Sequence, residues 1–234
     1  MWIVGHTALA YLVVRSGFFI AGKRPGPALI FMVLVFGNIL DATHFGWLRD
    51  VTHNPAGPVL FTLLWALIFQ RFGLVGKKDL GILMSAGAVH AAGDLVIGGY
   101  LPFFPFSGRA YYVWPWNSLE DLLLETILGA IFLAVLFLSR DYRGLVDFAA
   151  DQRRDFLAAI RTRSLFRREL LHAYIFIAFY LLMVGQFVFY VRTRTGHLLD
   201  ADVYSWLFLA VFALFMAAIS QIAFGKGACR KTDD

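Results

Sequence analysis

Seven apolar stretches, each near the length that crosses a bilayer, alternate with charged segments along this 234-residue chain. A helix needs about 20 apolar residues to span the hydrocarbon core, and it satisfies its own backbone hydrogen bonds there. Only 16% of the residues are charged, against about 25% in soluble domains. The pattern predicts an all-α integral membrane protein with a bundle of about seven transmembrane helices, over residues 2–20, 27–47, 57–75, 80–98, 119–139, 170–191 and 203–224.

One charged segment, residues 141–168, combines arginines with apolar residues at helical spacing, among them Leu145 and Phe148. This pattern predicts an amphipathic helix on the membrane surface, which would bind anionic lipids through its arginines. A cytoplasmic protein partner is the alternative. The chain then divides into a membrane core with the metal site (residues 1–139), a basic amphipathic segment (140–168), and two C-terminal membrane helices with a tail (169–234).

The lysines and arginines predict the orientation of the helices. With the N-terminus outside and the C-terminus in the cytoplasm, all but four of the 21 basic residues fall on the cytoplasmic side. The exceptions are Arg49, Arg109, Arg192 and Arg194. This distribution accounts for the net charge of +5 without a nucleic-acid partner. No basic region precedes the first apolar stretch, so we expect no cleavable signal peptide.

Ligand-type side chains gather at one depth of this predicted bundle, near its extracytoplasmic face. Asp41 and His44 are spaced i, i+3 in the second predicted helix, and His90 and Asp94 are spaced i, i+4 in the fourth. Either spacing puts a pair on one helix face. The whole set is His6, Asp41, His44, His53, His90 and Asp94.

This set predicts a metal site. An ionised aspartate near the bilayer core costs about 2.5–3.5 kcal/mol, so it needs a compensating partner. Carboxylate oxygens and imidazole nitrogens are common ligands of divalent metals. Since Cys229 is the only cysteine, a cysteine-rich zinc site is excluded. We expect one or two divalent ions, zinc first; the alternative for each histidine is a hydrogen bond between helices.

Several short motifs occur in the order seen in one known family. They are Gly5-His6, Leu40-Asp41-Ala42-Thr43-His44, Thr52-His53, His90-Ala91-Ala92-Gly93-Asp94 and Leu119-Glu120. Through them, residues 5–125 resemble the membrane-bound metal-dependent hydrolases of bacteria and archaea, the YdjM type. The resemblance implies hydrolysis of a phosphoester or lipid, because that family is distantly similar to zinc-dependent phospholipase C. Thr43 replaces the second aspartate of the family's motif, so one carboxylate is missing.

The resemblance also implies catalytic roles. Glu120, at the outer start of the fifth long helix, would be a ligand or the general base. Glu125 is a weaker candidate, and Asp121 is expected to be an exposed cap, since carboxylates favour a helix N-terminus. Asp41 would serve both as a ligand and in catalysis, because Thr43 leaves it as the only carboxylate of its motif.

The aromatic segment at residues 100–116 follows the His90 motif. It predicts either an aromatic belt at the lipid–water boundary or an interfacial lid in which Arg109 pairs with a phosphate.

Three other functions compete with a phosphoester hydrolase. A ceramidase-like zinc amidase would also use His and Asp at an embedded zinc. A metal or proton transporter would need polar residues that continue to the cytoplasmic side. A non-catalytic subunit would keep the metal for structure and pack its last two helices on a membrane-protein partner.

Overall fold

The computed structural model describes residues 3–41, 47–103, 105–116, 118–162, 170–194 and 203–225. Apart from two isolated β-bridges, the regular structure of these residues is helical, which confirms the all-α prediction. The elements are α1 (Ile3–Ile20), α2 (Pro27–Phe36), α3 (Trp47–Thr52), α4 (Gly57–Arg71), the 3₁₀ helix η2 (Lys77–Asp79), α5 (Leu80–Val96), α6 (Leu119–Leu138), α7 (Asp141–Arg161), α8 (Leu171–Arg194) and α9 (Val203–Phe224).

Four of the described helices are long and apolar enough to cross a membrane: α1, α6, α8 over Leu171–Phe189, and α9. Each of the other three predicted stretches does contain a helix. However, α2, α4 and α5 have 10, 15 and 17 residues, and a span needs about 20. The prediction of about seven spanning helices is therefore not supported. Shorter apolar helices pack among four candidate spans instead.

The largest difference from the sequence prediction is the early end of α2. The Asn38 side-chain amide donates to the Leu34 carbonyl at 2.9 Å and to Thr7 Oγ1 of α1 at 2.7 Å. After this point the backbone follows i→i+3 hydrogen bonds, including Asn38 N to Val35 O at 3.0 Å and Asp41 N to Asn38 O at 3.1 Å. An asparagine that bonds to the local backbone competes with the helix in this way. Asp41 consequently lies beyond α2, in 3₁₀ conformation directly after the turn of residues 37–40, and not on a face of the long helix that was predicted.

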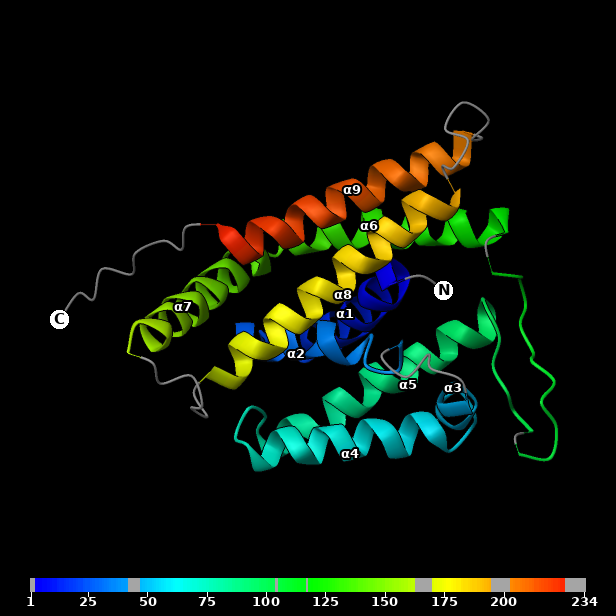
Figure 1. Ribbon diagram of the computed structural model, residues 1–234, viewed down its shortest axis with the longest axis horizontal. Helices are drawn as coiled ribbons and strands as arrows, with labels where there is room; N and C mark the ends of the chain where they lie inside the picture. Colours follow the sequence, from blue (N-terminus) through cyan, green and yellow to red (C-terminus); the bar gives the residue numbers. More distant parts are fainter. Residues whose placement is uncertain are drawn as a thin grey trace.

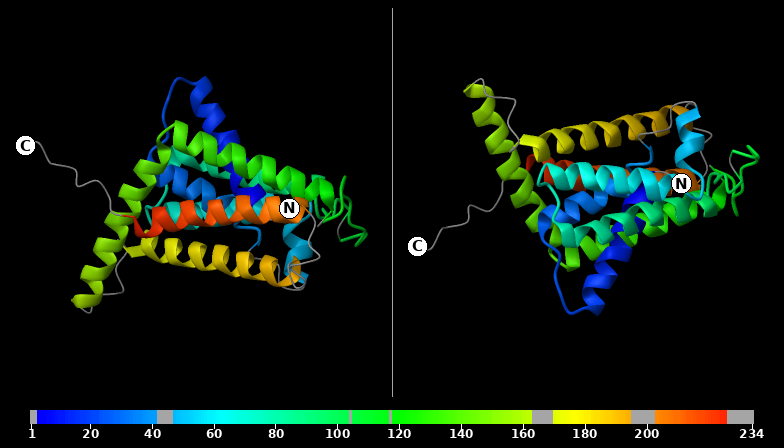
Figure 2. Two further views of the ribbon diagram at one scale, coloured as in Figure 1. Left: turned by 90° about the horizontal axis from the view of Figure 1, so that it is seen from above. Right: turned by 90° about the horizontal axis from the view of Figure 1, so that it is seen from below.

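The helices form a bundle with two different ends (Figures 1 and 2). α1 packs against both α5 and α6, α4 packs on α5, and α9 packs on α6. α7 runs across one end of the bundle, and the segment of residues 97–116 extends at the other end (Figure 2). The helix predicted within residues 141–168 is thus present as α7. Its contact with a membrane surface stays a prediction.

Arg15, the charge inside the first span, is paired within the bundle. Its Nε lies 2.8 Å from Asp141 Oδ2, and the Tyr11 hydroxyl donates to the same oxygen at 2.9 Å. Asp141 begins α7 directly after Arg140, whose left-handed φ of 61° turns the chain out of α6. A buried charge is tolerated when it is paired and hydrogen-bonded, so this network explains how α1 carries an arginine.

Candidate metal centre

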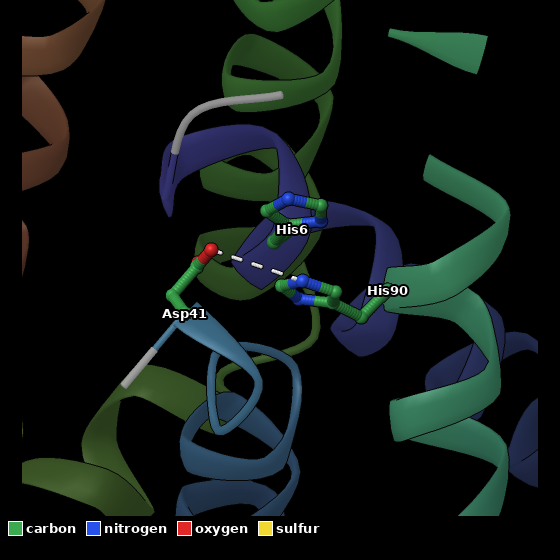
Figure 3. Close-up of side chains that lie close together, drawn as sticks. All are labelled: His6, Asp41 and His90. Carbon is green, nitrogen blue, oxygen red and sulfur yellow. Dashed lines mark ion pairs between the residues drawn. The ribbon is translucent and has the colours of Figure 1, made fainter. Parts of the chain in front are cut away.

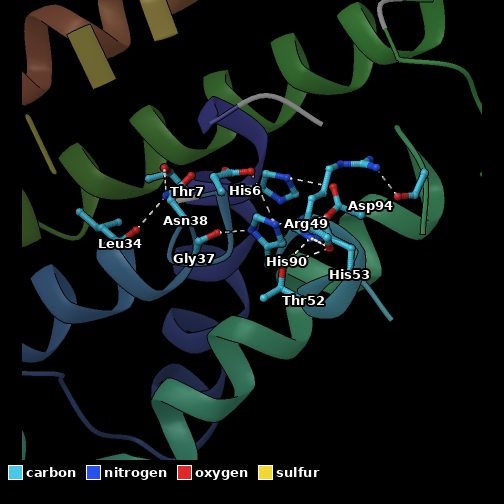
Figure 4. Close-up of polar contacts among 12 residues, drawn as sticks. His6, Thr7, Leu34, Gly37, Asn38, Arg49, Thr52, His53, His90 and Asp94 are labelled. Atoms are coloured by element: carbon cyan, nitrogen blue, oxygen red, sulfur yellow. Dashed lines mark hydrogen bonds and ion pairs between the residues drawn. The ribbon is translucent and has the colours of Figure 1, made fainter. Parts of the chain in front are cut away.

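Five of the six predicted ligands converge in one buried cluster: His6 from α1, Asp41 from the turn after α2, His53 directly after α3, and His90 and Asp94 from α5. Figure 3 shows His6, Asp41 and His90 facing one another, and Figure 4 shows His53 and Asp94 beside them. The sixth predicted ligand, His44, lies outside the described residues. The short helix α3, which places His53, was not predicted.

Asp94 is the centre of the cluster. Its Oδ1 lies 3.3 Å from His6 Nε2, and its Oδ2 lies 3.3 Å from His53 Nε2 and 3.2 Å from His90 Nε2. Asp41 Oδ1 lies 3.8 Å from the same His90 Nε2 (Figure 3). Three imidazoles therefore present their Nε2 atoms to two carboxylates.

These separations are compatible with a bound divalent metal. In a tetrahedral site with metal–ligand distances of about 2.0–2.2 Å, the ligand atoms lie roughly 3.3–3.6 Å apart. Ligand atoms of His6, Asp41 and His90, and equally of His53, His90 and Asp94, lie within 4.8 Å of one another. Both groups are buried and could hold a metal ion.

Backbone carbonyls fix two of the three imidazole rings (Figure 4). His90 Nδ1 lies 2.7 Å from the Gly37 carbonyl, and His53 Nδ1 lies 3.0 Å from the Arg49 carbonyl and 3.0 Å from Thr52 Oγ1. An Nδ1–H that donates to a carbonyl leaves the Nε2 lone pair for a metal, which is the usual outer-sphere arrangement of histidine ligands. The Thr52 hydroxyl thus helps to orient the ring of His53.

Gly37 makes the His90 contact possible because it lets α1 and the turn after α2 approach closely. A Cβ at this position would lie 2.7 Å from Ala10 Cβ and 3.1 Å from the His6 carbonyl. Any larger residue would push this turn away from α1, and the Gly37 carbonyl would move with it. The same close approach brings His6 and Asp41 to one side of His90.

His6 is held differently from the other two histidines. Its ring stacks on His90 with centroids 3.7 Å apart and 12° between the planes, and its buried Nδ1 has no hydrogen-bond partner among the described residues. The backbone N–H of Gly5 donates to Glu125 Oε2 at 2.6 Å. Glu125 thus fixes the first turn of α1 and, through it, the position of His6.

The carboxylates at the start of α6 do not follow the predicted roles. Glu120 is exposed and lies outside the cluster, whereas Asp121, expected to be exposed, is fully buried, as is Glu125. The cap is Ser118, whose Oγ accepts from the backbone N–H of Asp121 at 3.2 Å. Glu125, the weaker candidate in the sequence, is connected to the cluster through Gly5, the residue before His6. Its spacing from Glu120 puts the two residues on different faces of the helix.

An open cavity of about 600 Å³ adjoins the cluster. Asp41 and Asp94 form part of its wall together with Arg49, and residues of α8 also line it. No sequence pattern connects α8 with the site, because these segments are far apart along the chain. The distribution of basic residues did mark Arg49 as one of the few on the predicted outer side.

The aromatic segment does not bring Arg109 to the cavity. Arg109 is exposed, and its guanidinium carbon lies 5.5 Å from the centre of the Tyr111 ring. Tyr111 pairs with Tyr100 through two backbone hydrogen bonds of 2.9 and 2.8 Å. Partial burial, and then the negative charge of Asp94, raise the pKa of the Tyr100 phenol above its ordinary value. This phenol therefore stays protonated at neutral pH.

The fold and cluster together define an all-helical chain with four candidate membrane spans and a buried His/Asp group that could hold a metal ion. No protein-family model matches the chain, and no curated protein and no solved structure matches it either.

Proposed function

We propose that the chain is a membrane-embedded, metal-dependent phosphoester hydrolase with one divalent ion, zinc foremost. One observation carries this proposal: Asp41 and Asp94 belong both to the buried ligand cluster and to the wall of an open cavity. Structural zinc sites are closed by four protein ligands, whereas catalytic sites keep a position open to water or substrate. The resemblance of residues 5–125 to the YdjM-type hydrolases supports the same reaction class.

A single ion fits the cluster better than two. Both ligand groups include His90, and its Nδ1 is already paired with the Gly37 carbonyl. Its Nε2 has one lone pair and can bind one ion. If His90 binds one ion, a second ion in the other three-residue group would have only the two remaining ligands of that group.

The side chains around the ion would divide the work of hydrolysis. A divalent metal here would polarise the scissile bond and lower the pKa of a water molecule toward neutrality. His53, His90 and Asp94 would hold it. The Asp41 carboxylate, on the cavity wall and 3.8 Å from His90 Nε2, would accept a proton from the attacking water. Arg49 would pair with the phosphoryl oxygens.

A second candidate is a non-catalytic protein with a structural metal. The deep burial of His6, His53 and His90, each at most 1% exposed, favours it. A ceramidase-like amidase would use the same ligand types and differs only in the bond it cleaves.

Turnover separates these functions. We expect the purified protein in detergent to hydrolyse bis(4-nitrophenyl) phosphate, to lose this activity on chelation, and to regain it when zinc is added back. Hydrolysis of ceramide but not of the phosphodiester would replace the proposal with the amidase. Tightly held metal without turnover of either substrate would favour the structural role.

We also propose that the cluster opens toward the extracytoplasmic face, with the C-terminus in the cytoplasm. The distribution of basic residues and the opposite positions of α7 and residues 97–116 support this orientation (Figure 2). In a Cys229→Ser background, a cysteine at Gly108 should react with an impermeant thiol reagent in intact cells, while one at Gln152 of α7 should react only after permeabilisation. The reverse labelling pattern would place the cluster on the cytoplasmic side.

A further inference from the structure

The cavity beside the cluster has two chemically different walls. Asp41, Asp94 and Arg49 contribute charged groups to the lining. α8 contributes Leu181, Leu182, Gly185, Gln186 and Phe189, of which only Gln186 is polar. α8 contains a candidate membrane span, so its apolar wall lies at a depth where hydrocarbon is the natural neighbour. A water-soluble substrate would not need such a wall. A molecule with a polar head and an apolar chain would contact the charged residues with its head and the apolar residues of α8 with its chain.

Arg49 provides a site for an anion on the polar wall. Its side chain is half-buried, and Nη2 makes a long hydrogen bond of 3.4 Å to the Gly99 carbonyl (Figure 4). Arg49 forms no ion pair with any described residue, so most of its five N–H donors stay available. Guanidinium groups bind phosphate and carboxylate through paired hydrogen bonds. A divalent ion in the adjacent cluster would add to this attraction.

The shape of the apolar wall follows from how α8 packs. In its first half, Phe176 stacks against Phe31 of α2 at 5.4 Å, which closes that part of the interface. In its second half, Phe187 contacts Phe212 of α9 at 5.1 Å and holds α8 in place. The cavity lies beside this second half, because α2 has already ended there. A groove between α8 and the cluster results.

The groove is open to the side. A Cβ at Gly185, which lines the cavity, would meet no atom within 4 Å. Leu181 is 62% exposed, although it lies in the candidate span. An exposed apolar side chain of a membrane-spanning helix contacts lipid. A lipid chain could therefore enter the groove from the bilayer without leaving hydrocarbon.

We propose that this cavity binds an anionic amphiphile, with its headgroup between Arg49 and the metal cluster and its hydrocarbon chain along α8 past Gly185. As the substrate class of the hydrolase, this inference rests on the proposed function. The binding itself needs no reaction: Arg49 is the cation that offsets the Asp41 and Asp94 carboxylates of the same lining, and α8 provides the apolar surface. The same headgroup chemistry could come from a lipid or from a free phosphate, so the test includes both.

The test measures binding of three probes to the purified full-length protein in non-ionic detergent. Hexadecylphosphonate has an anionic head, a long chain and a C–P bond that hydrolysis does not cleave. Methylphosphonate has the same head without the chain, and hexadecanol has the chain without the charge. Displacement of radiolabelled hexadecylphosphonate gives the three affinities. We expect hexadecylphosphonate to bind at least tenfold more tightly than either of the other probes.

Two variants assign the binding to the two walls. Arg49→Gln should weaken hexadecylphosphonate by roughly 10- to 100-fold, the usual worth of a charged hydrogen bond, and leave hexadecanol unchanged. Gly185→Leu should weaken both long-chain probes, since its side chain would fill the groove. Gly81→Leu in α5 is the matched control, because a Cβ there also meets no atom within 4 Å and Gly81 does not line this cavity. It should change neither affinity.

Equal binding of methylphosphonate and hexadecylphosphonate would overturn the inference in favour of a free phosphate. Unchanged binding in Gly185→Leu would also overturn it, since the groove would not hold the chain. Metal content and phosphodiester turnover, measured on the same samples, test the hydrolase proposal separately from the amphiphile-binding proposal. A wild-type protein that binds hexadecylphosphonate as expected but lacks metal and turnover would refute the hydrolase and retain this binding site.

Discussion

Replacing His90 by alanine should remove the metal from the purified protein, from about one ion per chain to near zero. His90 belongs to both possible ligand groups, and its Nε2 lies 3.2 Å from Asp94 and 3.8 Å from Asp41. No other histidine of the cluster shares this position. Removing a residue that only supports a metal ligand already lowers the affinity for the metal by roughly 10–100-fold. Removing a ligand that both groups share should lower this affinity at least as much. The measurement is elemental analysis after exhaustive dialysis.

His172→Ala is the matched control for this experiment. His172 is half-buried, its ring packs on Phe148 at 5.5 Å, and it belongs to neither ligand group. This variant should keep the metal content of the wild type. Thermal unfolding in detergent should show that His90→Ala still folds. Wild-type metal content in folded His90→Ala protein would refute the metal centre.

The sequence predicted most helices well because apolar length and end signals act locally. The predicted limits of α9 match the structure, and α6 begins where Ser118 caps it. The cluster was also accessible from the sequence. His6, Asp41, His53, His90 and Asp94 were chosen because imidazoles and carboxylates are poorly tolerated in apolar surroundings without partners. The order and orientation of the predicted helices were then enough to predict that these residues lie close together.

The remaining features depend on contacts between distant segments, which local patterns do not show. α2 ends early because Asn38 bonds to Thr7 of another helix. Hydropathy alone could not give that end, since Ile39 and Leu40 continue the apolar pattern beyond it. Glu125 is placed by its hydrogen bond to Gly5, and the cavity exists because α8 crosses beside a turn formed more than a hundred residues earlier. Assigning Glu120 a catalytic role relied on a motif, and the motif does not specify which face of α6 meets the cluster.

Asp41→Asn and Glu120→Gln should therefore differ sharply in phosphodiester turnover. The buried Asp41 carboxylate lies on the cavity wall beside His90, and an amide can neither accept a proton nor bind a cation as strongly. We expect its loss to lower the rate by roughly 10²–10⁴-fold, the usual contribution of a general base, with lower metal content if Asp41 is also a ligand. The exposed Glu120 is neither in the ligand groups nor among the residues that line the cavity. Its replacement should change the rate by no more than about twofold, as for other surface substitutions.

Rates and metal content measured on both variants test this assignment directly. Asp41→Asn that retains metal but loses turnover would identify Asp41 as the base, and joint loss would identify it as a ligand. Full turnover in Asp41→Asn would exclude it from both roles. A large rate loss in Glu120→Gln with unchanged metal would instead require Glu120 to reach the cluster in the working enzyme. Since α6 presents Asp121 and Glu125 to the interior and Glu120 to the exterior, that result would demand a rotation of the first turn of α6.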